Sequence, residues 1–172
     1  MTLMHPIEII QLTPDDWQAY RAIRLEALQT EPQAFGSAYA TNLQHPESFW
    51  RGRLEEAAAG QRGWLLFARA QDRLVGMIGA YITDDPAVVE IISTYVTPEY
   101  RGQGVGRALM NAILHAVSAH STFQTARLSV NVDQMAALRL YESSGFQIIG
   151  TEQVMMGDGR VHDQYIMTKS LR

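Results

Sequence analysis

An apolar, β-branched segment gives way to a glycine-rich loop at residues 96–109, which read VTPEYRGQGVGRAL. Residues 88–96, before the loop, are rich in Val, Ile and Thr and favour a central strand. A helix is expected over residues 104–120, and its apolar side chains share one face: Val105, Leu109, Ile113, Ala116 and Val117. The loop therefore joins the end of a strand to the start of an amphipathic helix.

Three glycines, Gly102, Gly104 and Gly106, lie in this loop. Glycine lets backbone N–H groups approach a ligand without an intervening Cβ, and a helix start adds unpaired N–H donors and a partial positive charge. These features suit a phosphate group, and Arg101 and Arg107 add two positive charges. The spacing matches neither a Walker loop nor a dinucleotide fingerprint. Taken alone, the glycines could equally cap and pack a tight turn.

The remaining segments predict a mixed α/β fold. We expect helices at about 13–28, 47–59 and 134–144, strands at 7–12, 63–70, 73–82, 126–132, 146–155 and 161–168, and mostly loop or short turns over 30–46. The order β-α-β-α-β-β in the second half requires at least one parallel strand pair. No repeat, low-complexity stretch or linker interrupts the chain, so we expect a single domain over residues 1–172.

Composition excludes several classes of protein. The 172 residues are 47% hydrophobic and 19% charged, as in soluble globular proteins. No apolar run reaches the ~18 residues of a membrane span, and the N-terminus lacks the pattern of a signal peptide, so we expect a cytoplasmic protein without a membrane partner. A net charge of -4 argues against nucleic-acid binding. The absence of Cys removes disulfides and thiolate metal sites, and the five scattered His residues predict no metal.

Residues 96–109 resemble the coenzyme A motif of the GCN5-related N-acetyltransferase (GNAT) superfamily, Arg/Gln-x-x-Gly-x-Gly/Ala after a strand, which Arg101, Gly104 and Gly106 satisfy. A second block is also similar to the family: a strand over 128–131, then Ala-x-x-Leu-Tyr-x-x-x-Gly-Phe over 137–146. The family usually has Asn seven residues before this Tyr, where the chain has the longer amide of Gln134. The order of elements is similar along the whole chain.

The resemblance implies a GNAT-type fold, in which helices flank a central, twisted, mostly antiparallel sheet with one splayed parallel strand pair. It implies acetyl-CoA as co-substrate, with the pantetheine arm between the splayed strands and the pyrophosphate on residues 103–107. The cofactor-binding residues that it implies are Tyr95, Val96, Thr97, Arg101, Gly102, Gln103, Gly104, Val105, Gly106, Arg107, Asn131, Gln134, Ala137 and Tyr141.

The implied activity is transfer of an acetyl group to a primary amine, by direct transfer in a ternary complex. The resemblance places Tyr141 beside the departing sulfur, where a phenol with pKa ~10 would keep a proton to give to a thiolate of pKa ~8.5; alternatively it only packs. Glu90, on the strand before the loop, is the candidate general base; alternatively it is an exposed strand residue. Ser93 and Tyr95 could instead order a chain of water molecules that accepts the proton. The family also implies the Val96 N–H as oxyanion donor.

The acceptor site is expected from residues 30–46, with Phe35 and Tyr39 as walls or as core residues, and from the last hairpin. Small amines, amino acids, antibiotics, peptide N-termini and protein lysines all fit as acceptors. A non-catalytic acyl-CoA sensor and another phosphate-ligand binder are the alternative functions. Dimers are common in this superfamily, so the resemblance also allows a homodimer.

Overall fold

The computed structural model describes residues 5–172. Seven strands in this part of the chain form one sheet in the order β1-β2-β3-β4-β5-β7-β6. They are β1 (Ile7–Ile10), β2 (Gly63–Ala70), β3 (Arg73–Ile82), β4 (Val88–Val96), β5 (Thr125–Asn131), β6 (Gln147–Met155) and β7 (Val161–Ser170). Neighbouring strands are antiparallel except β4 and β5, which are parallel.

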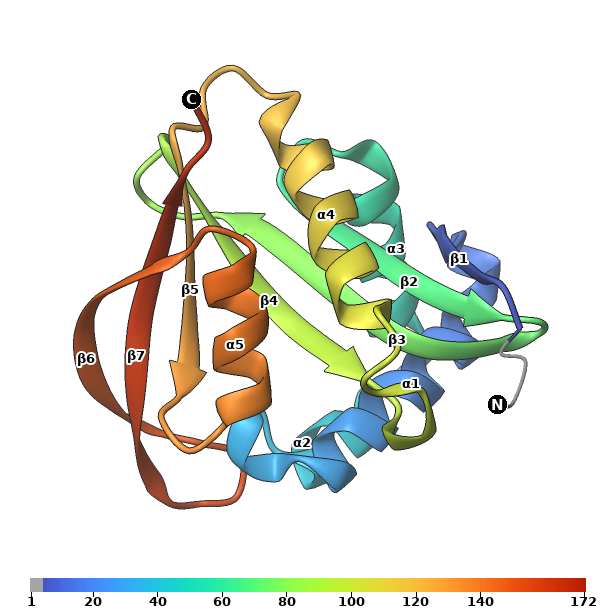
Figure 1. Ribbon diagram of the computed structural model, residues 1–172. Helices are drawn as coiled ribbons and strands as arrows, with labels where there is room; N and C mark the ends of the chain where they lie inside the picture. The colour runs from blue at the N-terminus through green and yellow to red at the C-terminus, as the bar shows by residue number, and fades with distance from the viewer. Residues whose placement is uncertain (1–4) are drawn as a thin grey trace.

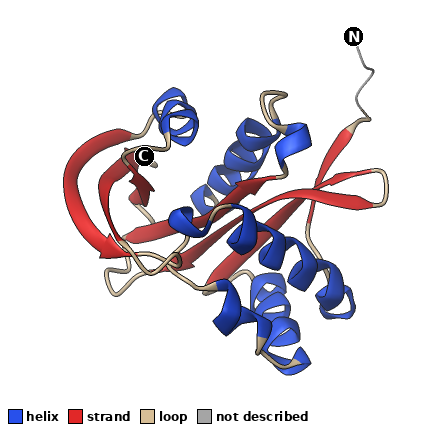
Figure 2. Ribbon diagram, turned by 90° about the horizontal axis from the view of Figure 1, so that it is seen from below, coloured by secondary structure: helices blue, strands red, loops and turns tan. Residues whose placement is uncertain are grey.

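Helices cover both faces of the sheet (Figures 1 and 2). They are α1 (Trp17–Thr30), α2 (Tyr39–Leu43), α3 (Glu47–Ala59), α4 (Val105–Ser118) and α5 (Met135–Ser143). Buried residues of α4 and α5 share one hydrophobic cluster with the sheet, and those of α1 and α3 form a second cluster on the opposite face. The fold expected from the sequence is therefore confirmed: mixed α/β, with a mostly antiparallel sheet, one parallel pair and flanking helices.

Most element boundaries agree with the expected ones, since α3, β2, β3 and β4 have the same bounds. Several differences occur in the N-terminal third. β1 ends at Ile10, a 3₁₀ turn at Pro14–Asp16 precedes α1, and α1 continues to Thr30. The segment expected to be mostly loop contains a 3₁₀ turn at Pro32–Ala34 and the short helix α2. Gly60 ends α3 in a left-handed conformation, φ 62°, which glycine adopts without a steric cost.

The parallel pair separates soon after it starts. β4 and β5 are in register only at Val88↔Thr125, Val89↔Ala126 and Glu90↔Arg127, after which their carboxyl halves diverge (Figure 1). A β-bulge in β4 accompanies this change: Ile92 pairs with Gly79 and Tyr95 with Met77, so that Ser93 and Thr94 oppose one residue of β3. Ser93 has φ 58°. Because a bulge bends and twists its strand, β4 turns away from β5 at this point.

Candidate functional site

Three connected hollows pass through the sheet where β4 and β5 diverge. The outer groove, about 540 Å³, lies between the glycine loop and α5, and the inner pocket, about 580 Å³, lies on the side of α1 and α3. The central cleft, about 310 Å³, joins them. It shares Thr94 and Tyr141 with the outer groove, and Phe35 and Ser93 with the inner pocket. A ligand in the outer groove can therefore meet a second ligand from the inner pocket within the sheet.

The glycine loop forms one wall of the outer groove. Gly102 and Gly104 have φ of 73° and 86°, a region that L side chains rarely adopt, and a Cβ on either would meet no atom within 4 Å. Gly106 differs, because its Cβ would come within 3.1 Å of Leu140 Cδ2 in α5. The first two glycines therefore permit the turn and leave open space beside it, and the third permits close packing of the two helices.

The start of α4 presents free amide groups to this groove. The N–H of Ala108 donates to the carbonyl of Gly104 at 3.0 Å. Among the described residues, no acceptor faces the N–H groups of Val105, Gly106 and Arg107. Three such donors at the positive end of a helix dipole favour an anion, and a phosphate fits this arrangement.

The two arginines of the loop have different surroundings. Arg101 donates from Nε to the Val96 carbonyl at 2.9 Å, and its Nη2 lies 3.0 Å from Glu31 Oε1. Arg107 donates only to the hydroxyl of Ser143, at 2.9 Å, and so keeps an uncompensated charge. The side chain of Gln103 is exposed and donates to the Glu99 carbonyl at 3.1 Å. Arg107 is therefore the loop cation available to an anionic ligand, whereas Arg101 braces the loop.

The end of β4 turns its free backbone groups toward the opening. The N–H of Thr97 donates to the Val75 carbonyl of β3 at 2.8 Å. In an antiparallel ladder hydrogen-bonded and non-hydrogen-bonded pairs alternate, so the next pair, Val96↔Gly76, directs its N–H and C=O groups away from the partner strand. The bond from Arg101 to the Val96 carbonyl agrees with this direction. The Val96 N–H is thereby left for a ligand between β4 and β5.

Tyr141 lies on α5 where the outer groove meets the central cleft. Its side chain packs edge-on against Phe146, with ring centroids 6.3 Å apart. Burial is the main cause that raises the pKa of the Tyr141 phenol above its usual value of 10, and the charge of Glu31 adds to this effect. A hydrogen bond with Thr94 acts in the opposite direction and lowers the pKa. The phenol therefore stays protonated at neutral pH and can act as a proton donor.

Glu90 lies on the other side of the β4 bulge, in the wall of the inner pocket. Its Oε2 accepts a 2.6 Å hydrogen bond from Nε of Arg127, and the two side chains form an ion pair. The hydrogen bond to Glu90 is the main cause that raises the pKa of Arg127 above its usual value. Glu90 and Tyr141 therefore face the passage from opposite sides of the sheet.

Gln134, Ala137 and Phe35 also line the central cleft. Other expected site residues have different surroundings. The hydroxyls of Tyr95 and Thr97 both donate to Glu26 Oε2 of α1, at 2.7 and 2.8 Å, so that both hydroxyls are directed toward α1.

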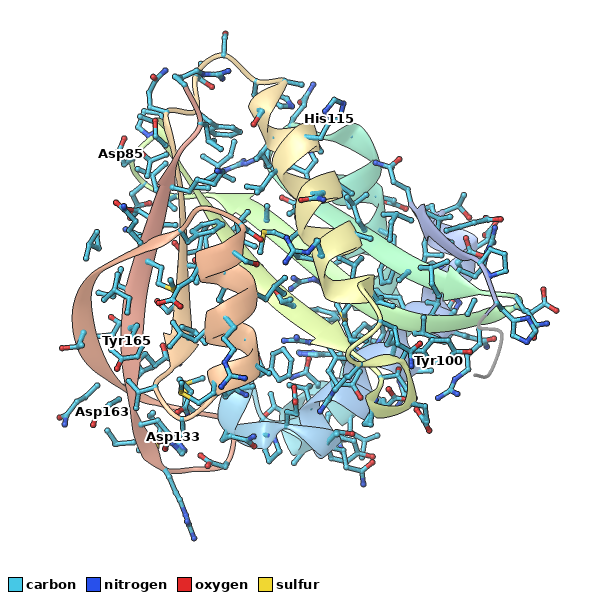
Figure 3. The ribbon with its side chains drawn as sticks, viewed as in Figure 1. Asp85, Tyr100, His115, Asp133, Asp163 and Tyr165 are labelled. Atoms are coloured by element: carbon cyan, nitrogen blue, oxygen red, sulfur yellow. The ribbon has the colours of Figure 1, made fainter. Side chains whose placement is uncertain are left out.

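Asn131 and Tyr39 do not line any of the three hollows. Asn131 is 3% exposed; its Oδ1 accepts from the Asp133 N–H at 2.9 Å, and its Nδ2 lies 3.1 Å from His162 Nδ1. These contacts order the turn after β5, which contains Asp133. Figure 3 labels Asp133 in this turn and Tyr100 in the turn after β4. Tyr39 packs against the cluster beneath α1 and α3.

The structure adds three residues that we did not select from the sequence: Arg24, Glu31 and Thr94 line the passage from α1, the segment after it and the bulge. Glu31 and Thr94 carry no recognisable signal. Arg24 does, since it stands on the apolar stripe of α1 between Tyr20 and Leu28, where a charge is unexpected.

Residues 5–172 contain no helix that is long and apolar enough to span a membrane, and no cluster of three or more His, Asp or Glu side chains suited to a metal ion.

Comparison with known proteins gives concordant results. The family model described as "Acetyltransferase (GNAT) family" matches residues 14–146. An uncharacterized N-acetyltransferase of Mycobacterium tuberculosis is 33% identical over 150 residues, which cover 84% of this chain and 93% of that protein. A mycothiol acetyltransferase of Kocuria rhizophila is 34% identical over 116 residues, 60% of this chain and 38% of that protein.

Solved structures share the fold at low sequence identity. A GNAT-family acetyltransferase from Streptococcus pneumoniae superimposes with a TM-score of 0.83 at 19% identity, covering 96% of this chain and 99% of that one. A putative acetyltransferase from Salmonella typhimurium with its cofactor acetyl-CoA gives 0.81 at 19% identity, with coverage of 97% and 95%. Because the family model spans most of the chain and the Mycobacterium protein is similar over nearly its whole length, this protein belongs to the acetyltransferase (GNAT) family.

Proposed function

We propose that the protein is an acyl-CoA-dependent N-acetyltransferase, which moves the acetyl group of acetyl-CoA to a primary amine by direct transfer in a ternary complex. One observation carries the proposal: the passage between β4 and β5 joins an anion-binding helix start to a second pocket on the opposite face of the sheet. Two substrates can enter from opposite sides and meet without a covalent intermediate on the protein. The absence of Cys agrees with direct transfer.

The outer groove has the chemistry that coenzyme A requires. The free N–H groups of Val105, Gly106 and Arg107 and the Arg107 guanidinium suit a pyrophosphate. The Val96 N–H lies at the outer groove and points away from β3, so that an extended amide chain such as pantetheine can pair with the strand there. We propose that these groups hold acetyl-CoA, which supplies the activated acyl carbon. Gln134 and Ala137 line the cleft from α5 and complete its wall.

The residues on each side of the bulge divide the proton transfers. A primary amine with pKa ~10.4 must lose a proton before it attacks a thioester. Glu90 faces the inner pocket, and we propose that it accepts this proton directly or through water. Tyr141 is a buried, protonated phenol at the opposite side, and we propose that it donates to the leaving sulfur. The Val96 N–H is the proposed donor to the oxygen on which negative charge develops.

The test is an assay of free thiol released from acetyl-CoA in the presence of a panel of primary amines. The first measurement is the thermal shift with acetyl-CoA alone, because a ligand at a hundredfold excess over its Kd stabilises the folded state by ~2.7 kcal/mol. A shift together with amine-dependent thiol release supports the proposal. A shift without turnover on any amine would favour the acyl-CoA sensor instead, and the absence of a shift would refute the cofactor assignment.

A further inference from the structure

We infer that the acceptor is a primary amine that carries a carboxylate, of the amino-acid class, and that Arg24 and Arg53 in the inner pocket bind this carboxylate. The inference rests on the proposed function and specifies its acceptor. It follows from two guanidinium groups that face the same pocket without a carboxylate partner, one of them next to the point where the pocket meets the central cleft.

Arg24 is the inner member of this pair. It is partly buried on α1, its Nη1 donates to the Ser93 hydroxyl at 3.2 Å, and its guanidinium carbon lies 5.1 Å from the centroid of the Phe35 ring. Burial lowers the pKa of Arg24, Tyr20 opposes this change, and the nearby charge of Arg53 adds to it. Its one side-chain hydrogen bond is to a neutral hydroxyl, so the remaining donors of the guanidinium are available to a carboxylate in the pocket.

Arg53 is the outer member, on α3. Its guanidinium carbon lies 5.6 Å from the Phe49 centroid, and its side chain borders both the inner pocket and the adjoining hollow beneath α1 and α2. Within residues 5–172, no Asp or Glu oxygen comes within 4.0 Å of a guanidinium nitrogen of Arg24 or Arg53. Arginines of the sheet are, in contrast, neutralised, for example Arg69 by Glu8 at 2.8 Å. The pair therefore creates a local positive charge in a protein whose net charge is -4.

The anion that fits this pair is defined by geometry. A planar guanidinium fork matches the two oxygens of a carboxylate, and Arg24 and Arg53 both line the inner pocket. The aromatic faces of Phe35 and Phe49 hold the guanidinium groups in place, so that few rotamers are lost on binding. A polyamine would place a second ammonium group against the same two charges, which disfavours that class of acceptor.

The distance between the carboxylate and the amine of the acceptor is limited by Ser93. This residue belongs to both the inner pocket and the central cleft, and it accepts directly from Arg24. A carboxylate on Arg24 therefore lies close to the end of the central cleft that adjoins the inner pocket. An amine only a few bonds from its carboxylate reaches this position, as in a free amino acid, whereas a long spacer between the two groups does not fit.

The test compares matched amines that differ in the carboxylate. Phenylalanine, tyrosine and histidine are assayed beside phenethylamine, tyramine and histamine, and beside their amino-acid amides, which retain the α-amine and remove the negative charge. Spermidine and a peptide with an acidic first residue are further arms. We expect kcat/KM to be at least about tenfold higher for one or more free amino acids than for the matched amine and amide, as for a charged hydrogen bond.

The variants are Arg24→Met and Arg53→Gln, with Arg69→Gln as the control on an exposed strand position. Each site variant should raise KM for the amino acid by about tenfold or more and leave the kinetics of the decarboxylated amine within about twofold. If Arg24→Met fails to fold, as judged by its thermal shift with acetyl-CoA, the exposed Arg53 carries the test. Calorimetric titration of the N-acetyl amino acid into the CoA-bound protein gives a readout that does not depend on turnover.

Several outcomes would overturn the inference. Equal or better turnover of the decarboxylated amines, of spermidine or of the acidic peptide would leave the acetyltransferase proposal standing and refute the carboxylate subsite. Equal losses for charged and uncharged acceptors in both variants would show that Arg24 and Arg53 only support the fold. Thiol release with none of the amines would instead refute the proposed activity, and failure of N-acetyl amino acids to bind would then refute the subsite independently.

Discussion

Glu90 and Arg127 form a 2.6 Å ion pair at the last register position that β4 and β5 share before they separate. The pair therefore lies where the gap between the two diverging strands begins. Glu90 is the better buried partner, with its side chain 12% exposed against 42% for Arg127. A carboxylate in this position serves two purposes, because it joins the parallel strands and it faces the pocket from which the amine is proposed to come.

Glu90→Gln should lower kcat/KM by about a hundredfold at neutral pH, since loss of a general base typically costs that much or more. The acidic limb of the wild-type profile, which reports the protonation of an essential base, should disappear in the variant. The measurement is thiol release from acetyl-CoA between pH 5 and 9, with saturating acetyl-CoA. A variant that retains the limb would show that another group accepts the proton.

Arg127→Met tests the same pair from its other member. Removing the guanidinium takes away the hydrogen bond that holds the Glu90 side chain, so kcat/KM should fall by about tenfold or more while acetyl-CoA still produces its thermal shift. Glu8→Gln is the matched control, because Glu8 and Arg69 form a similar cross-strand ion pair at the β1 edge of the sheet. Unchanged kcat/KM in Arg127→Met would mean that the ion pair only joins the strands.

Tyr141→Phe should lower kcat by about 10²–10⁴-fold, as expected for loss of a proton donor, while acetyl-CoA still produces its thermal shift. The raised pKa of the phenol sets the alkaline side of the profile: the donor is protonated below its raised value, so activity should persist through pH 9. Tyr165→Phe, on β7, is the control for loss of a phenol hydroxyl outside the passage. Unchanged kcat in Tyr141→Phe would leave this residue a packing role only.

The fold could be predicted largely from local patterns. β4 and α3 have their expected bounds because β-branched runs and a terminal glycine mark them clearly. The divergence of β4 and β5 could be expected only from the family resemblance. Its cause lies in the bulge at Ser93, a non-glycine residue with φ 58°. No local sequence pattern predicts a positive φ at such a residue.

The site was predicted less completely, because side-chain partners depend on tertiary packing. The glycine loop was visible in the sequence, but the position of its cation was not: Arg101 satisfies the family motif, yet it is held by Val96 and Glu31, which leaves Arg107 for an anion. Similarly, nothing in the β4 sequence indicates that Tyr95 turns its hydroxyl to α1.

Gly104→Ala should weaken acetyl-CoA binding by about tenfold or more, because an L residue at φ 86° moves the amide groups that start α4. The same strain should destabilise the fold by ~1–2 kcal/mol. Gly159→Ala is a matched control: it has φ 77° and equally open space, but it lies in the turn between β6 and β7. Both variants should lose similar stability in denaturant unfolding, and only Gly104→Ala should show a smaller acetyl-CoA thermal shift than wild type. Equal shifts would argue against the loop as the phosphate site.

Tyr95→Phe separates the side chain of this residue from its backbone. Burial is the main cause that raises the pKa of Tyr95 from 10.0 to about 12, with Thr30 opposing and Glu26 adding to it. Because the folded state then holds its proton more tightly than the unfolded state, wild-type stability should be unaffected below pH 10 and should fall between pH 10 and 12. The variant should lack the part of this alkaline loss that Tyr95 causes, and should be ~1–2 kcal/mol less stable at neutral pH, since Glu26 loses a donor.

Acetyl-CoA binding by Tyr95→Phe should be within about twofold of wild type, because the hydroxyl that is removed is bonded to Glu26 of α1. Urea unfolding at pH 7 and at intervals from pH 9 to 12, with and without acetyl-CoA, measures both effects. Tyr20→Phe is the control, as Tyr20 is another buried phenol beneath α1. A large loss of acetyl-CoA affinity in Tyr95→Phe would mean that the hydrogen bond from Tyr95 to Glu26 positions the end of β4 at the cleft. The backbone hydrogen bonds between β4 and β3 would then be insufficient to hold this strand end in place.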